Sequence, residues 1–360
     1  LKPHSLEDII AGISLYRPGP MDFIPQYIRG KNDPSSITYD CPQLEPILKP
    51  TYGCIVYQEQ VMQIVRDLAG YTLGRSDLLR RAMSKKKGDV MQKERQIFVY
   101  GDETANVPGC IKNGIDEKTA NKIYDEMIDF AKYAFNKSHA AAYAVVAYQT
   151  AWLKYYYPVE FMAALMTSVI ENPSKVAEYI YACRQMNIRI LPPDINKGEA
   201  DFSVDNGNIR YGLAAIKSIG KPVIQAIVQE RNAYGTYRNL EDFITRLSAK
   251  DVLNKRAIEN FIKAGALDTL GGTRKQFMSI YVQIVDHVNQ EKKYSMAGQM
   301  SLFDMASDDQ KEEFLIRLPD VGEYSKENLL AFEKEVLGIY ISGHPLEEYE
   351  GKWRKMISAT

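Results

Sequence analysis

An alanine-rich apolar run at residues 140–153, broken by Gln149, follows directly on four consecutive polar residues. A membrane span needs roughly 20 apolar residues, so the run predicts a buried helix and no contact with a membrane. The polar residues 136–139 place an amide, an ammonium, a hydroxyl and an imidazole at the start of this helix. Such a cluster is suited to holding an anion. The alternative is a helix capped by Ser138, with its neighbours in solvent.

Residues 75–87 form a second polar cluster, with six cations and one acid, although the whole chain has a formal net charge of −1. Apolar residues fall at helical spacing within it, at Leu78, Leu79, Ala82 and Met83. Arg80 and Arg81 would therefore project from a helix whose other face is buried. A guanidinium can bind two phosphate oxygens at once, whereas lysine supplies a mobile charge. A phosphate-binding helix and a solvated run of charge both fit this pattern.

Six short blocks follow one another along the chain. They are residues 15–20 (LYRPGP), 50–53 (PTYG), 56–62 (VYQEQVM), 79–83 (LRRAM), 135–139 (FNKSH) and 191–196 (LPPDIN). Together they resemble the fingers region of the family C replicative polymerase of bacteria, the alpha subunit of DNA polymerase III. The resemblance spans essentially the whole chain. It implies a fragment of a DNA-directed DNA polymerase, a nucleotidyltransferase of chromosomal replication.

The resemblance implies residue roles. The triphosphate of the incoming dNTP would be bound by Arg80, Arg81, Lys137, Ser138 and His139. Weaker candidates for phosphate or template contacts are Arg17, Lys85, Lys86 and Lys87. Tyr57, Gln58 and Glu59 either face the nascent base pair or have a structural role.

The fold class expected is mainly α with minor β. Residues 1–195 read as helical and would form a fingers domain that binds nucleotide and template. The Pro192–Pro193 pair should end the preceding helix and mark the domain boundary. Weak alternation around Asn206–Gly207 predicts a β-hairpin.

Two glycine turns between helical segments suggest a tandem helix-hairpin-helix domain at residues 196–290. The first turn lies within residues 216–227 and the second within 258–272. Such turns direct backbone N–H groups and a helix N-terminus at a DNA phosphate without reading bases. The DNA-binding candidates are Ser218, Gly220, Lys221 and Gly265. One such turn is usually a simple helix corner, whereas two in tandem favour duplex binding.

Residues 291–322 are polar and would be a flexible segment carrying a short docking motif. Gln299 is followed by Leu302 and Phe303, an amide anchor with two apolar side chains. This pattern resembles the motif by which polymerases bind the sliding clamp, the beta subunit. The alternative is a loop that anchors to its own domain. Residues 323–360 would be a linker toward an OB-fold that lies beyond the sequence.

Catalytic residues and metal ligands are not expected in this chain. Two-metal phosphoryl transfer needs closely spaced carboxylates, and the sequence contains no Asp-x-Asp. In the family these carboxylates lie in the palm, so Mg²⁺ would bind to the full-length enzyme outside this fragment. The fragment would bind primer–template DNA, dNTP, the clamp and other replicase subunits, and alone would be inactive.

Composition adds little. With 45% hydrophobic and 25% charged residues, the chain is globular and large enough for two or three domains. Its four cysteines are far apart, which indicates neither disulfides nor zinc and fits a reducing bacterial cytoplasm, where the replisome associates with the nucleoid. The chain starts at Leu1 and not at Met, as expected for an internal fragment. The alternative function is a non-enzymatic helix-hairpin-helix module that binds nucleic acid.

Overall fold

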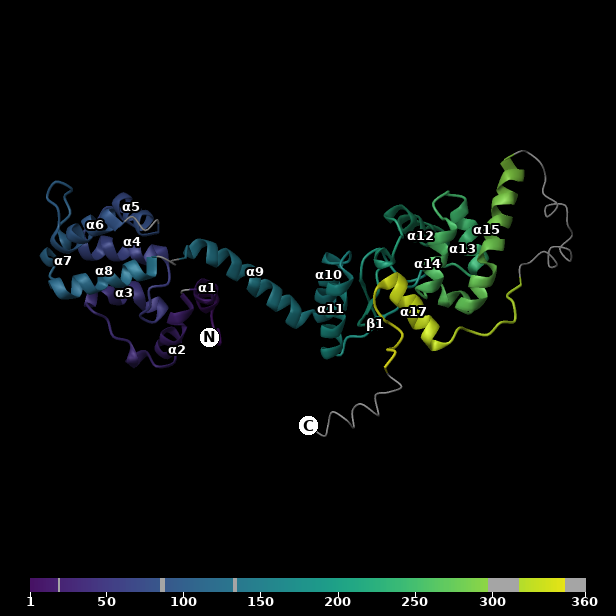
Figure 1. Ribbon diagram of the computed structural model, residues 1–360, viewed down its shortest axis with the longest axis horizontal. Coiled ribbons are helices and arrows are strands. Elements are labelled where there is room, and N and C mark those ends of the chain that lie inside the picture. The colour runs from purple at the N-terminus through teal and green to yellow at the C-terminus, as the bar shows by residue number, and fades with distance from the viewer. Residues whose placement is uncertain (19, 85–87, 132–134, 297–316, 347–360) are drawn as a thin grey trace, which may run out of the picture. The chain divides into compact units, whose positions relative to one another are not determined.

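The computed structural model describes residues 1–18, 20–84, 88–131, 135–296 and 317–346 (Figure 1). The chain divides into two compact units, Leu1–Trp152 and Leu153–Thr360, which we call unit 1 and unit 2. The division falls inside one long helix, α9 (Lys137–Tyr156). Each unit is mostly helical, which confirms the expected mainly α class.

Unit 1 contains the helices α1 (Leu6–Leu15), α2 (Ile24–Asn32), α3 (Glu45–Leu48), α4 (Gln58–Ala69), α5 (Leu73–Ser84), α6 (Gly88–Tyr100), α7 (Gly109–Lys112), α8 (Glu117–Ala131) and the start of α9. Helices α4, α5, α6 and α8 pack side by side (Figure 1). The periodic residues of α4, Val61, Ile64, Val65 and Leu68, are fully buried between them. Gly70 ends α4 with φ of 78°, a left-handed conformation that favours glycine.

A second core in unit 1 joins α1 and α2 to the first turns of α9. Leu15 and Tyr27 are buried in it together with Ala140 and Ala144, which lie one turn apart on α9. Their small side chains let the start of α9 approach the other helices closely. Further along the run Val146, Tyr148 and Trp152 are exposed, so the prediction that the whole run forms a buried helix is wrong. The loop before α4, including Val56 and Tyr57, is part of the same core. This packing brings the starts of α4 and α9 together.

In unit 2 the end of α9 is followed by α10 (Pro158–Ser168) and α11 (Pro173–Gln185), which precede a small sheet. The sheet has the order β1-β3-β2, with β1 (Ile190–Leu191) parallel to β3 (Asn208–Arg210) and β2 (Ser203–Asp205) antiparallel to it. Asn206 and Gly207 join β2 to β3 with φ values of 50° and 74°, as a tight hairpin turn requires. The predicted β-hairpin is therefore confirmed.

The rest of unit 2 is helical: α12 (Lys221–Tyr234), α13 (Leu240–Ser248), α14 (Lys255–Lys263), α15 (Arg274–Met296) and α17 (Lys326–Leu337). Helices α13, α14 and α15 pack together, and α17 packs on α14 (Figure 1). One continuous apolar core runs from α10 and α11 through Ile209 of the sheet to these helices.

The boundary between the two compact units lies after Trp152, earlier in the sequence than the domain boundary expected near residue 195. The reason is packing, because Met162 and Met166 of α10 and Ile180 of α11 are buried in the core of unit 2. The Pro192–Pro193 pair follows β1 and lies within unit 2. The preceding helix, α11, already ends at Gln185, so the prediction that the proline pair ends this helix is wrong. A proline pair shows where a helix cannot continue, and it does not show which core the preceding helix joins.

Within the described residues, no helix is both long and apolar enough to cross a membrane. The four cysteines are buried free thiols, and burial raises the pKa of the Cys54 and Cys183 thiols to about 11.

Candidate nucleotide and DNA-binding sites

The N-termini of α4 and α9 are joined by hydrogen bonds in unit 1. The backbone N–H of Gln58 donates to the carbonyl oxygen of Phe135 at 3.0 Å. The Glu59 carboxylate accepts from the backbone N–H of Lys137 at 3.1 Å and from the side-chain amide of Asn136 at 3.0 Å. An acid in the first turn of α4 therefore also stabilises the first turn of α9, where the helix dipole favours negative charge.

Asn136 caps α9, and Ser138 does not. The backbone N–H of His139 donates to the side-chain oxygen of Asn136 at 2.9 Å, the pattern of an N-cap residue. The alternative in which Ser138 caps the helix is therefore wrong. Ser138 lies inside the first turn and is exposed, as is His139. The signal in the sequence was Asn136 itself, since asparagine is among the strongest N-cap residues.

Three of the predicted cations and polar residues gather around Phe135 and Tyr57. The Arg17 guanidinium lies over the Phe135 ring, 4.6 Å from its centroid. The Lys137 ammonium lies 5.2 Å from the Tyr57 centroid and 3.1 Å from a carboxylate oxygen of Glu7. The His139 ring is 5.4 Å from the Phe135 ring, centroid to centroid.

Arg80 on α5 reaches the same place through Gln58. Its Nη1 donates to the Gln58 side-chain oxygen at 3.0 Å, and its Nη2 is 2.6 Å from an Asp77 oxygen. The Nε of Arg81 lies 2.7 Å from the other Asp77 oxygen, and its side chain is largely exposed. The hydrogen bond from Arg80 lowers the pKa of Asp77 and keeps it ionised. The structure thus links Arg80 to the α4–α9 junction through its hydrogen bond to Gln58. Arg81 instead pairs with Asp77, the carboxylate that Arg80 also contacts. Lys85, Lys86 and Lys87 lie outside the described residues.

Tyr57, Gln58 and Glu59 occupy the centre of this arrangement. Gln58 and Glu59 connect α5 and α9 to α4, so a structural role is visible for both. The Tyr57 side chain is buried, and its hydroxyl makes no hydrogen bond among the described residues. Burial raises the pKa of Tyr57, and the nearby Glu7 and Glu59 carboxylates raise it further, so the phenol stays neutral.

The first glycine turn of unit 2 leaves backbone donors free at a helix start. Gly220 directly precedes α12 as its N-cap residue and, as a glycine, has no side chain to cap this helix start. Ser218, Gly220 and Lys221 donate their backbone N–H groups to no described residue. Ahead of the turn there is a short 3₁₀ helix, Leu213–Ala215, where the sequence predicted a full helix. Ile216 and Ile219 are buried and hold the turn on the core.

The second glycine turn is covered by side chains of the same chain. Gly265 has φ of 76°, and a Cβ atom placed there would lie 2.1 Å from Nη2 of Arg274. That guanidinium is buried and lies 2.8 Å from an Asp268 oxygen. The backbone N–H groups of Arg274 and Lys275, which start α15, donate to the Glu323 carboxylate at 2.9 and 3.1 Å. A carboxylate therefore already occupies the position that an anion would take at this helix start.

The clamp-motif residues Gln299, Leu302 and Phe303 lie outside the described residues. Among the residues that the structure describes, no group of three or more His, Cys, Asp or Glu side chains could hold a metal ion.

Comparison with known proteins defines the class first. Residues 1–106 match the family described as the bacterial DNA polymerase III alpha subunit finger domain, and residues 187–277 match a helix-hairpin-helix motif. Residues 1–106 are thus similar to a polymerase finger domain and residues 187–277 to a helix-hairpin-helix motif, in the order that the sequence predicted.

Curated relatives then identify the particular family. The chain is 43% identical to DNA polymerase III subunit alpha of Escherichia coli (strain K12), over 97% of this chain and 30% of that protein. It is 45% identical to the Deinococcus radiodurans protein of the same name, over 98% of this chain and 26% of the relative. The Thermus aquaticus relative is 44% identical over 100% of this chain and 28% of its own length. The chain is therefore homologous to part of the bacterial DNA polymerase III alpha subunit, and it spans less than a third of these relatives.

Proposed function

We propose that this chain is the substrate-binding part of a DNA-directed DNA polymerase that replicates bacterial chromosomes. The observation that carries the proposal is the gathering of Arg80, Lys137 and His139 around the joined starts of α4 and α9. These residues belong to a unit whose first 106 residues match a polymerase finger domain. The relatives align with nearly the whole chain, so an isolated helix-hairpin-helix module of another kind is not favoured.

The incoming dNTP would bind at the start of α9 through its triphosphate. Lys137 and Arg80 would contact phosphate oxygens, with Ser138 and His139 adding hydrogen bonds from the exposed first turn. Lys137 and Arg80 now contact Glu7 and Asp77, so binding would exchange carboxylate partners for phosphate. This exchange keeps both cations paired in the free protein and limits the cost of leaving them without a partner. Arg81, exposed beside Asp77, would take a peripheral phosphate contact.

Chemistry would lie elsewhere in the full-length polymerase, where carboxylates outside this chain would hold Mg²⁺. The 360 residues alone should show no primer extension with Mg²⁺ and dNTPs. Unit 2 would hold the duplex product by its backbone, and Gln299, Leu302 and Phe303 would bind the sliding clamp. The protein would work in the cytoplasm as part of the replisome, together with other replicase subunits.

The test uses the full-length polymerase that contains this chain. Arg80→Ala or Lys137→Ala should raise the KM for dNTP or lower kcat, because each loses one charge-assisted contact, worth roughly 1.5–3 kcal/mol. His139→Ala should have a milder effect, because it loses an ordinary hydrogen bond. The matched control is Arg66→Ala on α4, whose guanidinium pairs with Asp67 away from this site. Reduced duplex affinity with intact nucleotide kinetics would show that Arg80 and Lys137 contact template instead.

The clamp contact is tested with the 360-residue chain and a purified bacterial sliding clamp. The double change Leu302→Ala with Phe303→Ala should abolish binding, since burying each side chain is worth roughly 1.5–3 kcal/mol. Met300→Ala should leave binding nearly unchanged. Unaltered clamp binding by the double variant, with a lowered melting temperature, would instead show that the segment anchors to its own domain.

A further inference from the structure

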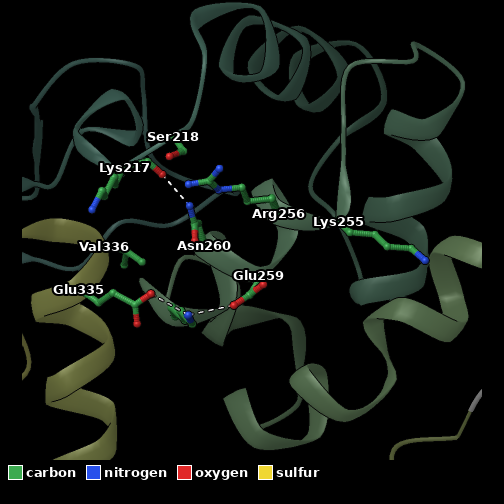
Figure 2. A pocket seen from close by; sticks show the side chains of 9 residues that line it. Lys217, Ser218, Lys255, Arg256, Glu259, Asn260, Glu335 and Val336 are labelled. Carbon is green, nitrogen blue, oxygen red and sulfur yellow. Dashed lines mark hydrogen bonds and ion pairs between the residues drawn. The ribbon is translucent and has the colours of Figure 1, made fainter.

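A pocket of about 450 Å³ lies beside the first glycine turn, between that turn and α14 (Figure 2). The turn contributes Lys217 and Ser218, and α14 contributes Lys255, Arg256, Glu259 and Asn260. Asn260 is buried and donates from its side-chain amide to the Lys217 carbonyl at 2.7 Å. The backbone N–H of Lys217 donates to the Val336 carbonyl at 2.8 Å. The turn is therefore fixed in position against α14.

Four cations line the pocket, and two of them are already neutralised. Lys263 lies 2.9 Å from carboxylate oxygens of both Glu259 and Glu335, so the two acids of the pocket are engaged. Lys255 pairs with Asp286 at 2.6 Å, and its side chain is directed away from the pocket centre (Figure 2). Lys217 and Arg256 form no ion pair with any described residue. Their charges give the pocket its positive excess.

Arg256 stands at an electrostatically unfavourable place for its own helix. It is the second residue of α14, whose start is capped by Asn254, and the first turn contains no acid. The N-terminal end of a helix dipole is positive and repels a cation there. Figure 2 shows the guanidinium directed toward the turn, at Ser218. A bound anion at this point would offset the repulsion and would also meet the free N–H groups of the turn.

We infer that this pocket binds a phosphodiester group of a nucleic-acid backbone, with Arg256 as its main anchor and Lys217 beside it. The group would be a neighbour of the phosphate held by the N–H groups of the first turn. Successive phosphates of one strand would thus meet two different elements, the turn and α14. The inference rests on the proposed duplex binding by the first turn and adds a residue outside the helix-hairpin-helix pattern.

The test measures binding of the 360-residue chain to a fluorescent duplex by anisotropy at several salt concentrations. Arg256→Ala should weaken binding about tenfold, as expected for one lost charge-assisted contact. It should also lower the slope of log affinity against log salt by about 0.9, the value for one phosphate. The matched control is Lys255→Ala, a neighbouring cation that is directed away from the pocket, and it should change affinity less than twofold.

A thermal melt separates binding from folding. Arg256→Ala should melt at the same or a slightly higher temperature than the original chain, because it removes a cation from the positive end of α14. Weaker duplex binding with a clearly lowered melting temperature would overturn the assignment, since it would make Arg256 a structural residue. An unchanged affinity and salt slope would overturn it as well.

Gly220→Val distinguishes this inference from the proposed function, because a branched side chain blocks close approach of the turn to phosphate. If Gly220→Val weakens duplex binding and Arg256→Ala does not, the turn binds DNA and the pocket does not. If neither variant changes affinity, duplex binding by this face fails altogether. Inorganic phosphate is added at constant ionic strength as a competitor. Displacement of the duplex from the original chain and not from Arg256→Ala would make the pocket a small-anion site and overturn the backbone assignment.

Discussion

The two glycine turns of unit 2 differ in what already occupies their helix starts. The first turn presents backbone N–H groups at Ser218, Gly220 and Lys221 that no described residue accepts. After the second turn, the Glu323 carboxylate accepts the backbone N–H groups of Arg274 and Lys275 at the start of α15, the next α-helix. A glycine turn ahead of a helix therefore does not by itself make a phosphate-binding site. Whether it can bind a phosphate depends on which groups the rest of the fold places there.

The comparison also shows how a similar pattern can stabilise the fold. Arg274 lies against Gly265, pairs with Asp268, and is 3.5 Å from the buried Glu333. Glu333 in turn accepts the backbone N–H groups of Ile341 and Ser342 at 2.9 and 3.0 Å. The second turn is thus the centre of a polar network that ties α15 to α17 and the segment after it. We propose that the first turn binds DNA and that the second holds unit 2 together, which leaves the predicted DNA contact of Gly265 without geometric support.

The largest effect should come from Arg274→Ala. Its guanidinium is buried, and removal would leave Asp268 and Glu333 without their cation. Breaking such a buried ion pair costs roughly 3–5 kcal/mol. Urea unfolding should show this loss in unit 2, and Arg256→Ala, at an exposed position, should stay within about 0.5 kcal/mol. If Arg274→Ala lowers the free energy of unfolding by less than about 1 kcal/mol, the second turn does not have the structural role proposed for it.

Alanine at each turn glycine should give opposite results. At Gly265 the φ of 76° and the contact with Arg274 make a side chain strained, so the free energy of unfolding should fall by at least about 1–2 kcal/mol. At Gly220 a Cβ would meet only the Pro222 Cδ, at 3.5 Å, so stability should be nearly unchanged while duplex affinity falls. Melting and anisotropy on both variants check this. Equal losses of affinity would show that both turns bind DNA.

Sequence reasoning predicted the parts of this molecule that depend on local pattern. The periodicity of α4 and the Asn206–Gly207 turn are local, and both are present. The ordered blocks identified the family because each block is short and contiguous. The closure of the second turn was not predictable in this way, because Glu323 lies 49 residues beyond Arg274. The link from Arg80 to Gln58 is equally non-local, across 22 residues.

Glu323→Ala tests whether the second turn is closed only by that carboxylate. Loss of a helix-capping group should cost about 1 kcal/mol of stability. Duplex affinity should not rise by more than the general effect of removing one acid, because Arg274 still covers Gly265. Glu327→Ala, an exposed acid on α17, measures that general effect. An affinity several times higher for Glu323→Ala than for Glu327→Ala would make the second turn a latent phosphate site.

Ser218→Gly should give the smallest effects, and they should have opposite signs. Ser218 has φ of 64°, a left-handed conformation that costs a residue with a side chain roughly 1–2 kcal/mol. Glycine removes this strain and loses more entropy on folding, about 0.5–1 kcal/mol, so stability should rise by about 0.5 kcal/mol. Duplex affinity should fall about two- to fivefold if the exposed hydroxyl donates to a phosphate, as expected for one neutral hydrogen bond.

The matched control for Ser218→Gly is Asn206→Gly in the β2–β3 turn. Asn206 also has positive φ, at 50°, and lies in a turn of unit 2 that has no proposed phosphate contact. It should gain less stability, because asparagine tolerates this conformation better than serine does, and its duplex affinity should stay unchanged. If Ser218→Gly gains stability with no loss of affinity, the hydroxyl makes no contact and the turn binds phosphate through its backbone alone. A loss of affinity in both variants would mean that turn rigidity, and not a hydroxyl contact, determines duplex binding.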